Sequence, residues 1–174
     1  MKAYHYTVSD RIASIRKHGI KLAGAGVLGL EKHAVWFSTN PVYETTACKA
    51  GTSSLQGMID FGFTPVRFVV DREMFDWKYH KAHSGIKSAI ARGLEEAGKQ
   101  TNANPSEWFA VYEPVKEWLA IEVYRNGQWV ELEEDEIENL AKQKTPFPLP
   151  IDEDEGFTIS MSVGEFLSQM RRAG

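Results

Sequence analysis

Short runs of apolar residues, many mixed with polar positions and most bounded by Gly, Pro, Asn or Ser, recur through the first 132 residues. Runs of this kind predict short strands, whereas apolar residues spaced three or four apart predict amphipathic helices. The expected strands cover residues 3–7, 34–38, 65–71, 107–112, 118–124 and 128–132. Asn126-Gly127 between the last two strands is the strongest hairpin signal in the chain.

Helices are expected between several of these strands. Ser9 offers an N-cap to a first helix, and Gly19 offers its C-cap. Asn40-Pro41 ends the second strand, and a helix is expected to begin near Tyr43. A further amphipathic helix is expected over residues 84–98, after an aromatic turn at 74–80. Strands and helices together predict a mixed α+β domain.

The chain of 174 residues fits one domain with a tail. We expect a domain over residues 1–132 and an acidic extension over 133–174. The extension contains an acidic helical stretch, the sequence TPFPLP and a terminal helix from Ser162 with capping-box spacing. Charge follows the same division, because residues 1–125 carry 16 Lys and Arg against 13 Asp and Glu, whereas 126–174 carry 4 against 11.

Composition narrows the classes of protein. A hydrophobic fraction of 43% is typical of a globular domain. Cys48 is the single cysteine, so an intrachain disulfide and a multi-cysteine zinc site are both excluded. The amino terminus lacks the apolar run of a signal peptide, and no segment approaches the roughly 20 apolar residues of a membrane span. We therefore expect a cytoplasmic protein without membrane contact.

Several residues that could carry chemistry fit ordinary structural roles equally well. His5 stands between two tyrosines on the first strand, and Glu107 opens an apolar strand. Residues 24–29 match the dinucleotide pattern GxGxxG, but no strand precedes them and no helix follows, which favours a loop. No nucleophile elbow or Cys-His signature accompanies Ser38 or Cys48.

A basic stretch over residues 78–92 permits two interpretations. Its lysines surround His80 and His83 and disfavour a metal cation there, so no metal site is expected. Together with the neighbouring aromatic residues it also has the composition of a surface that grips nucleic acid and stacks bases. An ordinary solvated helix face has the same composition. The aromatic residues are Phe75, Trp77 and Tyr79.

Three segments, taken in order, resemble the ADP-ribosyltransferase superfamily, in the branch of diphtheria-type toxins and poly(ADP-ribose) polymerases that carries a His-Tyr-Glu triad. YHYTVSDRIASIRKHGIKL resembles the first motif, a strand with His followed by a helix and a Gly turn. AVWFSTNPVYETTACKA resembles the second, an aromatic strand that leads into a helix. PSEWFAVYEPVKEWLAIEV resembles the third and places its glutamate at Glu107. The resemblance covers about residues 3–125.

The resemblance implies a split β-sandwich with flanking helices that clamps NAD, used as a co-substrate, between two sheets. It implies a mono-ADP-ribosyltransferase, a glycosyltransferase, with a protein or nucleic-acid acceptor. Glu107 is then expected to stabilise the oxocarbenium-like ribose, and His5 to hold the adenine-side ribose. The residues expected to contact the cofactor are His5, Tyr6, Thr7, Trp36, Ser38 and Tyr43.

One departure from the family concerns the aromatic member of the triad. Trp36 stands where the family has a tyrosine, and Tyr43 supplies a nearby aromatic ring. An indole offers a flat surface to the cationic nicotinamide ring but no phenol hydroxyl. Two alternatives therefore stay open. One is an RNA 2′-phosphotransferase-like enzyme on the same fold, and the other is a degenerate, non-catalytic nucleotide-binding module.

Overall fold

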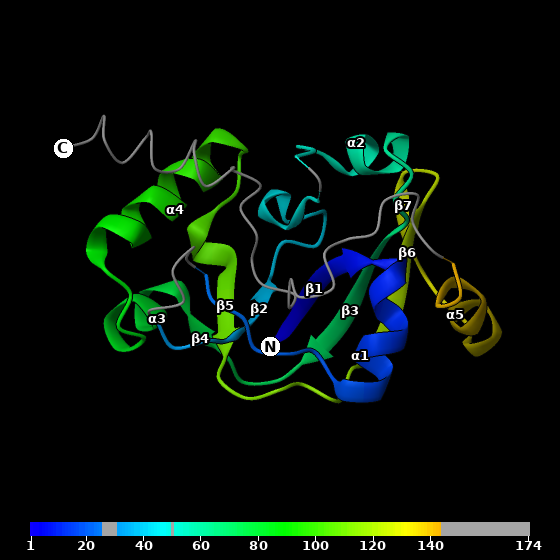
Figure 1. The fold of residues 1–174 in the computed structure, drawn as a ribbon, viewed down its shortest axis with the longest axis horizontal. Coiled ribbons are helices and arrows are strands. Elements are labelled where there is room, and N and C mark those ends of the chain that lie inside the picture. Colours follow the sequence, from blue (N-terminus) through cyan, green and yellow to red (C-terminus); the bar gives the residue numbers. More distant parts are fainter. Residues whose placement is uncertain (26–30, 50, 144–174) are drawn as a thin grey trace.

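The computed structural model describes residues 1–25, 31–49 and 51–143 and shows a mixed α+β fold. Its strands form one seven-stranded antiparallel sheet in the order β4-β5-β2-β1-β3-β6-β7 (Figure 1). The strands are β1 Lys2–Val8, β2 Val35–Ser38, β3 Pro65–Asp71, β4 Phe75–Asp76, β5 Trp108–Val111, β6 Ala120–Arg125 and β7 Gln128–Glu131. The α-helices are α1 Ile12–His18, α2 Leu55–Asp60, α3 Trp77–His83, α4 Ser88–Gln100 and α5 Glu134–Leu140. Short 3-10 turns are η1 Ser9–Arg11, η2 Thr45–Ala47 and η3 Pro105–Glu107.

Backbone pairing within the sheet is shortest between β1 and β2. β1 pairs with β3 along all seven residues, and β2 pairs with β5 along all four. β1 and β2 pair only at Tyr4 and Ser38. The sheet therefore consists of two well-paired halves, β4-β5-β2 and β1-β3-β6-β7. We call the line between β1 and β2 the joint.

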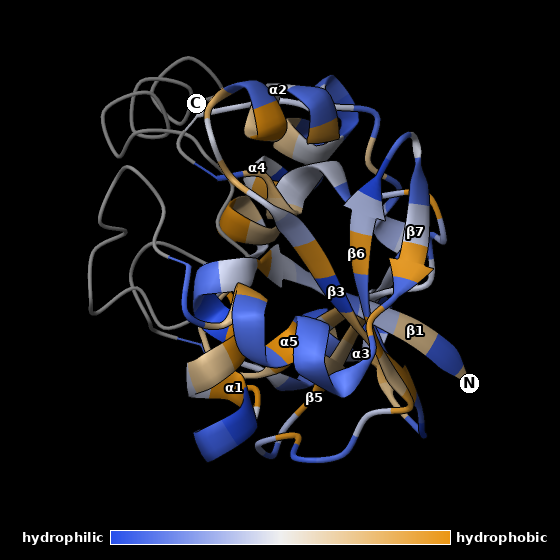
Figure 2. Cartoon of the chain, turned by 90° about the vertical axis from the view of Figure 1, so that its right-hand side faces the viewer, coloured by the Kyte–Doolittle hydropathy of each residue, from blue (hydrophilic) through white to orange (hydrophobic). Residues whose placement is uncertain are grey.

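The two faces of the sheet are covered differently. Helices α1 and α5 pack on one face through Ile12, Ile15, Ile137 and Leu140, which share one apolar cluster with all the central strands. On the other face the apolar residues form two clusters, one under α3 and α4 and one under α2. In Figure 2 hydrophobic residues appear along β3, β6 and β7, and hydrophilic residues along much of α5. The division of the second face coincides with the joint.

Most strands match the sequence expectations. β3 has the predicted bounds, and β1 and β2 differ from the predicted ranges by one residue at each changed end. The hairpin between β6 and β7 is confirmed, since Asn126 and Gly127 both adopt positive φ, 52° and 83°. Gly19, with φ of 81°, ends α1 as predicted. Backbone at such φ values favours Gly and Asn, which explains why these turns are readable from sequence.

The prediction of a helix that begins near Tyr43 is wrong. The Asn40 side-chain oxygen accepts hydrogen bonds from the backbone N–H groups of Val42 and Tyr43. This side chain holds the chain in a turn, and only η2 follows it before α2. Asn residues compete with helices in this way because their side chains replace backbone partners.

Other boundaries also differ from expectation. α1 begins at Ile12 after η1, so Ser9 is not its N-cap. The predicted aromatic turn is instead β4 followed by α3, and the Asp76 carboxylate caps that helix by accepting from the Tyr79 N–H. α4 begins at Ser88 rather than at residue 84. β5 begins at Trp108, so Glu107 ends η3 and is not a strand residue.

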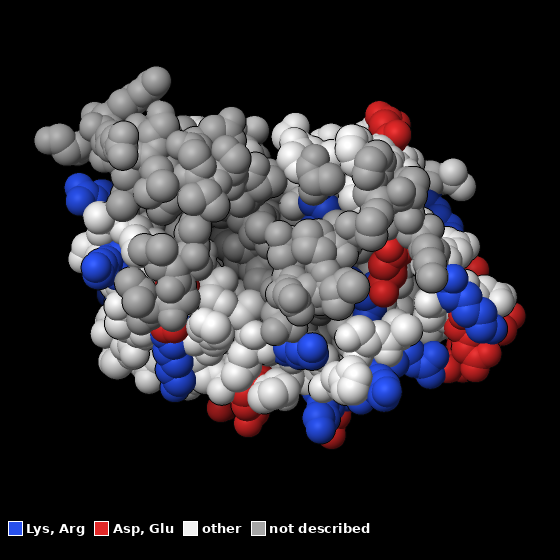
Figure 3. Space-filling view, viewed as in Figure 1, with Lys and Arg blue, Asp and Glu red and all other residues white. Residues whose placement is uncertain are grey.

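The predicted acidic helix after residue 132 is α5, which has a capping box between Glu133 and Glu136. Glu134 pairs with Arg16, and Glu136 pairs with Arg125 at 2.7 Å. Figure 3 shows acidic and basic side chains interspersed on the side of the molecule where α5 lies. The described part of the extension thus packs on the main core. The predicted TPFPLP strap, the terminal helix and residues 26–29 of the glycine-rich pattern lie outside the described residues.

Gly98 allows α4 to approach the strand that follows Glu107. A Cβ atom at position 98 would lie 2.8 Å from two ring carbons of the fully buried Trp108. We expect Gly98→Ala to lower the free energy of unfolding by about 1–3 kcal/mol through overpacking, despite better helix propensity. Urea denaturation measures this loss. Glu96→Ala, on the exposed side of the same turn, should change stability by less than about 0.5 kcal/mol. Similar losses in both variants would contradict the packing argument.

Candidate functional site

Glu107 lies beside the end of β2, on the β5 side of that strand, and is linked to the joint through Asn40. Its backbone carbonyl accepts a hydrogen bond from the Thr39 N–H at 3.0 Å. Its side-chain Oε2 accepts a hydrogen bond from the Asn40 Nδ2 at 3.2 Å. The side chain is half-buried. The carboxylate is therefore fixed by a neighbouring strand end while remaining accessible.

Asn40 connects Glu107 with the first strand. The Asn40 backbone carbonyl accepts a hydrogen bond from the Tyr6 hydroxyl, and the Asn40 N–H donates to Ser38 Oγ at 3.2 Å. Tyr6 belongs to β1, whereas Asn40 follows β2. The Tyr6–Asn40 bond crosses the joint, whereas the Asn40–Ser38 bond is local to the end of β2. Sequence reasoning treated Asn40 only as a strand breaker and missed this role.

Arg67 on β3 stabilises the Tyr6 side of this network. Arg67 is 6% exposed, and its guanidinium forms an ion pair with Glu122 on β6. It also donates to the Tyr6 hydroxyl at 3.3 Å and to the Pro41 carbonyl. The rings of Tyr4 and Trp129 lie 4.1 and 4.5 Å from the guanidinium carbon, within cation–π range. Burial raises the pKa of the Tyr6 hydroxyl, which therefore remains a neutral donor.

Glu44 contributes a second, buried carboxylate near the same strand end. Oε2 accepts from Trp108 Nε1 at 3.0 Å, and Oε1 accepts from the Thr46 hydroxyl at 2.7 Å. Ser38 also hydrogen-bonds to this side chain. Burial raises the pKa of Glu44, while these hydrogen bonds act in the opposite direction. With these donors around it, Glu44 holds η2 against β5.

His5 lies on the face of the sheet opposite most of these groups. Its Nδ1 is 2.9 Å from the Trp36 carbonyl, and its ring meets the edge of Phe37. Because a carbonyl only accepts, Nδ1 carries the proton in this bond. His5 thus ties β1 to β2 across the joint. Thr7 is also buried on this face, and its hydroxyl has no hydrogen-bond partner among the residues that the structure describes.

Trp36 is enclosed in the cluster under α3 and α4. Its ring lies 4.6 Å from the ring of His80 and 5.9 Å from that of Trp77, and it is 4% exposed. Its Nε1 donates to the Ala23 carbonyl at 3.3 Å. An exposed indole wall, as the sequence suggested, is therefore not present in this arrangement.

Tyr43 packs against Tyr6 on the half of the face under α2. The two rings meet edge to face at 5.2 Å. The Tyr43 hydroxyl donates to the Met58 sulfur at 3.0 Å, and burial raises its pKa. Of the residues predicted for the site, the structure brings Tyr6, Ser38, Tyr43 and Glu107 together around Asn40 on this face of the joint. It places His5 and Thr7 behind the sheet and Trp36 under α3.

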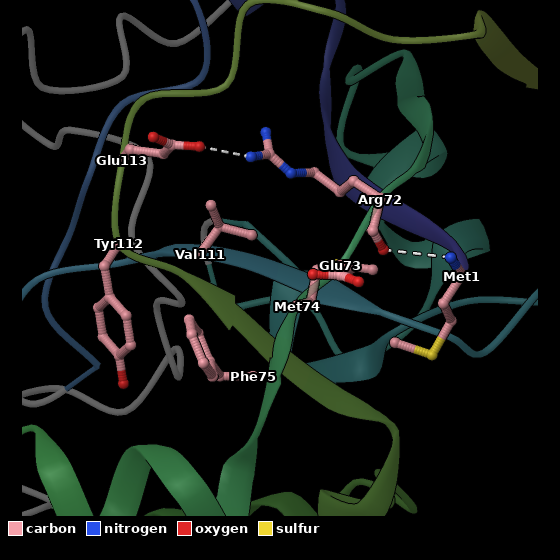
Figure 4. Close-up of a pocket in the computed structure, with 8 residues that line it drawn as sticks. All are labelled: Met1, Arg72, Glu73, Met74, Phe75, Val111, Tyr112 and Glu113. Atoms are coloured by element: carbon pink, nitrogen blue, oxygen red, sulfur yellow. Dashed lines mark hydrogen bonds and ion pairs between the residues drawn. The ribbon is translucent and has the colours of Figure 1, made fainter.

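Other glutamates near Glu107 in sequence occupy different places. Glu122 belongs to the ion pair with Arg67, and Glu117 is exposed. Glu113 pairs with Arg72 at 2.6 Å beside a pocket of about 660 Å³ (Figure 4). Tyr112, Phe75 and Met74 also line this pocket, which lies beyond the end of β5 remote from Glu107. Glu107 is thus the member of this group that contacts Asn40, the residue bonded across the joint to Tyr6.

The structure also bears on the metal site, the nucleic-acid surface and the membrane span that the sequence analysis considered. Among the described residues no three His, Cys, Asp or Glu side chains are grouped as metal ligands. Trp77 is buried, which removes one of the three rings proposed to stack bases. Phe75 and Tyr79 are exposed and stack on each other at 4.4 Å. Within the described ranges, no helix has both the length and the apolar character needed to cross a membrane.

Comparison with known proteins yields no relative. No family model, curated protein or solved structure matches the chain.

The ion pair of Arg67 should be a large contributor to stability. Arg67→Ala leaves Glu122 partly buried without its partner, and we expect a loss of about 3 kcal/mol in the free energy of unfolding. Arg125→Ala is the matched control, because the Arg125–Glu136 pair is solvent-exposed and should cost less than about 1 kcal/mol. Urea denaturation of both variants measures the difference. Equal losses would show that burial of the pair is unimportant.

His80 should make stability depend on pH. It is fully buried beside Trp36 and Trp77, and burial lowers its pKa to about 4, with Glu31 opposing the shift. Below the unfolded-state pKa of about 6.5 the unfolded chain gains a proton that the folded protein excludes, so stability falls as pH decreases toward 4. Between pH 7 and 5 we expect this group to contribute a loss of about 2 kcal/mol.

Chemical denaturation at the two pH values tests this expectation. His80→Gln should remove this part of the pH dependence. His83→Gln should retain it, because His83 is exposed. An unchanged pH dependence in His80→Gln would contradict the assignment.

Proposed function

We propose that the chain is an NAD-dependent mono-ADP-ribosyltransferase whose site lies at the joint, with Glu107 as its catalytic carboxylate. The observation that carries this proposal is the half-buried Glu107 side chain held by Asn40, whose backbone carbonyl accepts a hydrogen bond from Tyr6 across the joint. The three sequence segments that resemble the superfamily contain β1, β2 and β5, the strands that surround this site, which supports the proposal. The resemblance implied two sheets, whereas the strands form one sheet, so the fold supports the proposal only through the division of that sheet into two well-paired halves.

The proposed reaction breaks one glycosidic bond and forms another. The bond between ribose C1′ and the nicotinamide nitrogen breaks, and its electron pair leaves with the now neutral nicotinamide. A nucleophilic atom of the acceptor bonds to C1′ and releases its proton to solvent or a base. Positive charge develops on the ribose ring during this exchange, as in glycoside cleavage.

A fixed carboxylate lowers the barrier of such a step. Negative charge near the ribose stabilises the oxocarbenium-like transition state more than the ground state. Glu107 meets this requirement because Asn40 and the Thr39 backbone fix it to the end of β2. Water would otherwise have to reorganise around the developing charge, which is the cost that a preorganised group avoids.

The remaining predicted residues would position NAD and the strands around it. Tyr6, Ser38 and Tyr43 belong to the same hydrogen-bonded and aromatic network as Glu107. His5 would act by holding β2 to β1, since its Nδ1 is engaged by the Trp36 carbonyl. Trp36, enclosed between Trp77 and His80, would hold β2 against α3 rather than stack on the nicotinamide. Thr7, which is buried on the other face of the sheet, would contact NAD only through a rearrangement of β1.

The RNA 2′-phosphotransferase alternative receives less support. That chemistry relies on several arginines and histidines at a phosphate. The arginine of this network, Arg67, already binds Glu122 and lies between two aromatic rings. A non-catalytic nucleotide-binding module is the second alternative, and an activity assay separates it from the proposed enzyme.

The acceptor of the proposed reaction is a protein or a nucleic acid. Exposed Phe75 and Tyr79 retain the stacking surface expected of a nucleic-acid site, and Lys78 is exposed beside them. Lys81, by contrast, pairs with Glu95 at 2.6 Å. Nucleic-acid binding by this stretch stays a prediction.

Substitution of Glu107 tests the proposed function. We expect Glu107→Gln to retain NAD binding but to lower nicotinamide release by about 100-fold or more, the scale of losing one preorganised electrostatic group. Labelled NAD, incubated with and without cell lysate as the source of acceptor, reports nicotinamide release. Calorimetry reports NAD binding.

Glu113→Gln provides the matched control, because it changes the same residue type beyond the other end of β5 and should keep wild-type turnover. Wild-type turnover in Glu107→Gln would remove Glu107 from the mechanism. Binding of NAD without nicotinamide release in the wild-type protein would favour the non-catalytic module.

A further inference from the structure

The side-chain amide of Asn40 has an orientation that its neighbours determine. Its Oδ1 lies 2.9 Å from the Val42 nitrogen and 3.3 Å from the Tyr43 nitrogen, and both are backbone donors. Donors require an acceptor, so the oxygen must face them. The Nδ2 group is then directed at Glu107 Oε2, which is 3.2 Å away. The two ends of one amide thus perform two separate tasks.

We propose that Asn40 is the positioning residue for Glu107, which its Nδ2 group holds in the orientation needed for reaction. This inference rests on the proposed function, in which Glu107 is the catalytic carboxylate. An ionised carboxylate is an acceptor, and a neutral amide donor orients it without adding a competing positive charge to the site. A Lys or Arg in this place would instead neutralise the negative charge that the ribose requires.

The position of Asn40 is itself fixed from two sides. Its carbonyl accepts the Tyr6 hydroxyl, and the carbonyl of the next residue, Pro41, accepts from Arg67. Arg67 also donates to Tyr6 and is anchored by Glu122. The chain of contacts therefore runs from a buried ion pair through the strand end to the Glu107 carboxylate. A carboxylate held in this way keeps one orientation, which matters because small misplacements of a reacting group cost large factors in rate.

A purely structural role for Asn40 is the competing interpretation. In that case its oxygen would serve the turn before Tyr43, and the contact with Glu107 would be incidental. Asn40→Asp separates the two interpretations. Aspartate is close in shape and keeps an oxygen for the Val42 and Tyr43 amides, but it replaces the donor with a carboxylate oxygen that repels Glu107.

We expect Asn40→Asp to lower kcat for nicotinamide release by about 10- to 100-fold, with little change in KM for NAD. The control is Asn104→Asp. The Asn104 side-chain oxygen caps η3 by accepting from the Ser106 N–H and hydroxyl, so this variant makes the same chemical change beside Glu107. It should keep the wild-type kcat. Wild-type kcat in Asn40→Asp, or equal losses in both variants, would overturn the proposal.

A second measurement does not depend on activity. At pH 7 the repulsion introduced by Asn40→Asp requires an ionised Glu107. We therefore expect Asn40→Asp to lower the urea midpoint of the wild-type protein but to leave that of Glu107→Gln nearly unchanged, a result given by a double-mutant cycle.

The two measurements distinguish the failure of each proposal. If the double-mutant cycle shows that the effects of Asn40→Asp and Glu107→Gln on stability are coupled, but the wild-type protein releases no nicotinamide, the Asn40–Glu107 contact is supported and the transferase function is overturned. Equal midpoint losses in both backgrounds would overturn the positioning role of Asn40, whether or not the wild-type protein transfers ADP-ribose.

Discussion

The buried Arg67–Glu122 ion pair is the interaction on which the arrangement of the joint depends. A buried guanidinium is costly to desolvate, and that of Arg67 persists because a carboxylate, a hydroxyl, a carbonyl and two aromatic rings surround it. These partners come from four segments of the chain, namely β1, the turn after β2, β6 and β7. The charge therefore fixes the mutual position of β1, β3, β6 and the turn after β2 at a place where backbone pairing between β1 and β2 is almost absent.

The sequence predicted the strands better than the helices for physical reasons. Strand runs such as Pro65–Asp71 and the Asn126-Gly127 turn depend on local patterns and backbone conformations, which neighbouring residues determine. The helix predicted from Tyr43 failed because the Asn40 side chain binds the amides that would begin it. The aromatic stretch at 74–80 became β4 and α3 because Asp76 caps a helix there, a signal that was present in the sequence and was not used.

The candidate site was predictable only in part. Glu107, Tyr6, Ser38 and Tyr43, which the family resemblance assigns to one site, all contact Asn40, but the resemblance could not orient side chains. The alternation of strand residues decides that His5 shares a face with Phe37 and not with Trp36. Arg67 had a readable signal, since a charge within an apolar central strand needs a buried partner. Asn40 and Glu44 gave no such signal, because their roles depend on contacts between distant segments.

The single backbone pair between β1 and β2 also affects where the sheet opens locally. Separation of β1 from β3 requires the loss of a ladder of seven residue pairs, whereas separation along the joint breaks one backbone pair, a set of side-chain bonds and the part of the apolar cluster under α1 and α5 that spans both halves. Local opening follows the path that disrupts the fewest buried contacts. Backbone pairing is therefore weakest along this line, and several of the side-chain bonds that cross it belong to residues that we assign to the site. In this protein, rigidity of the site and cohesion of the two halves are one property.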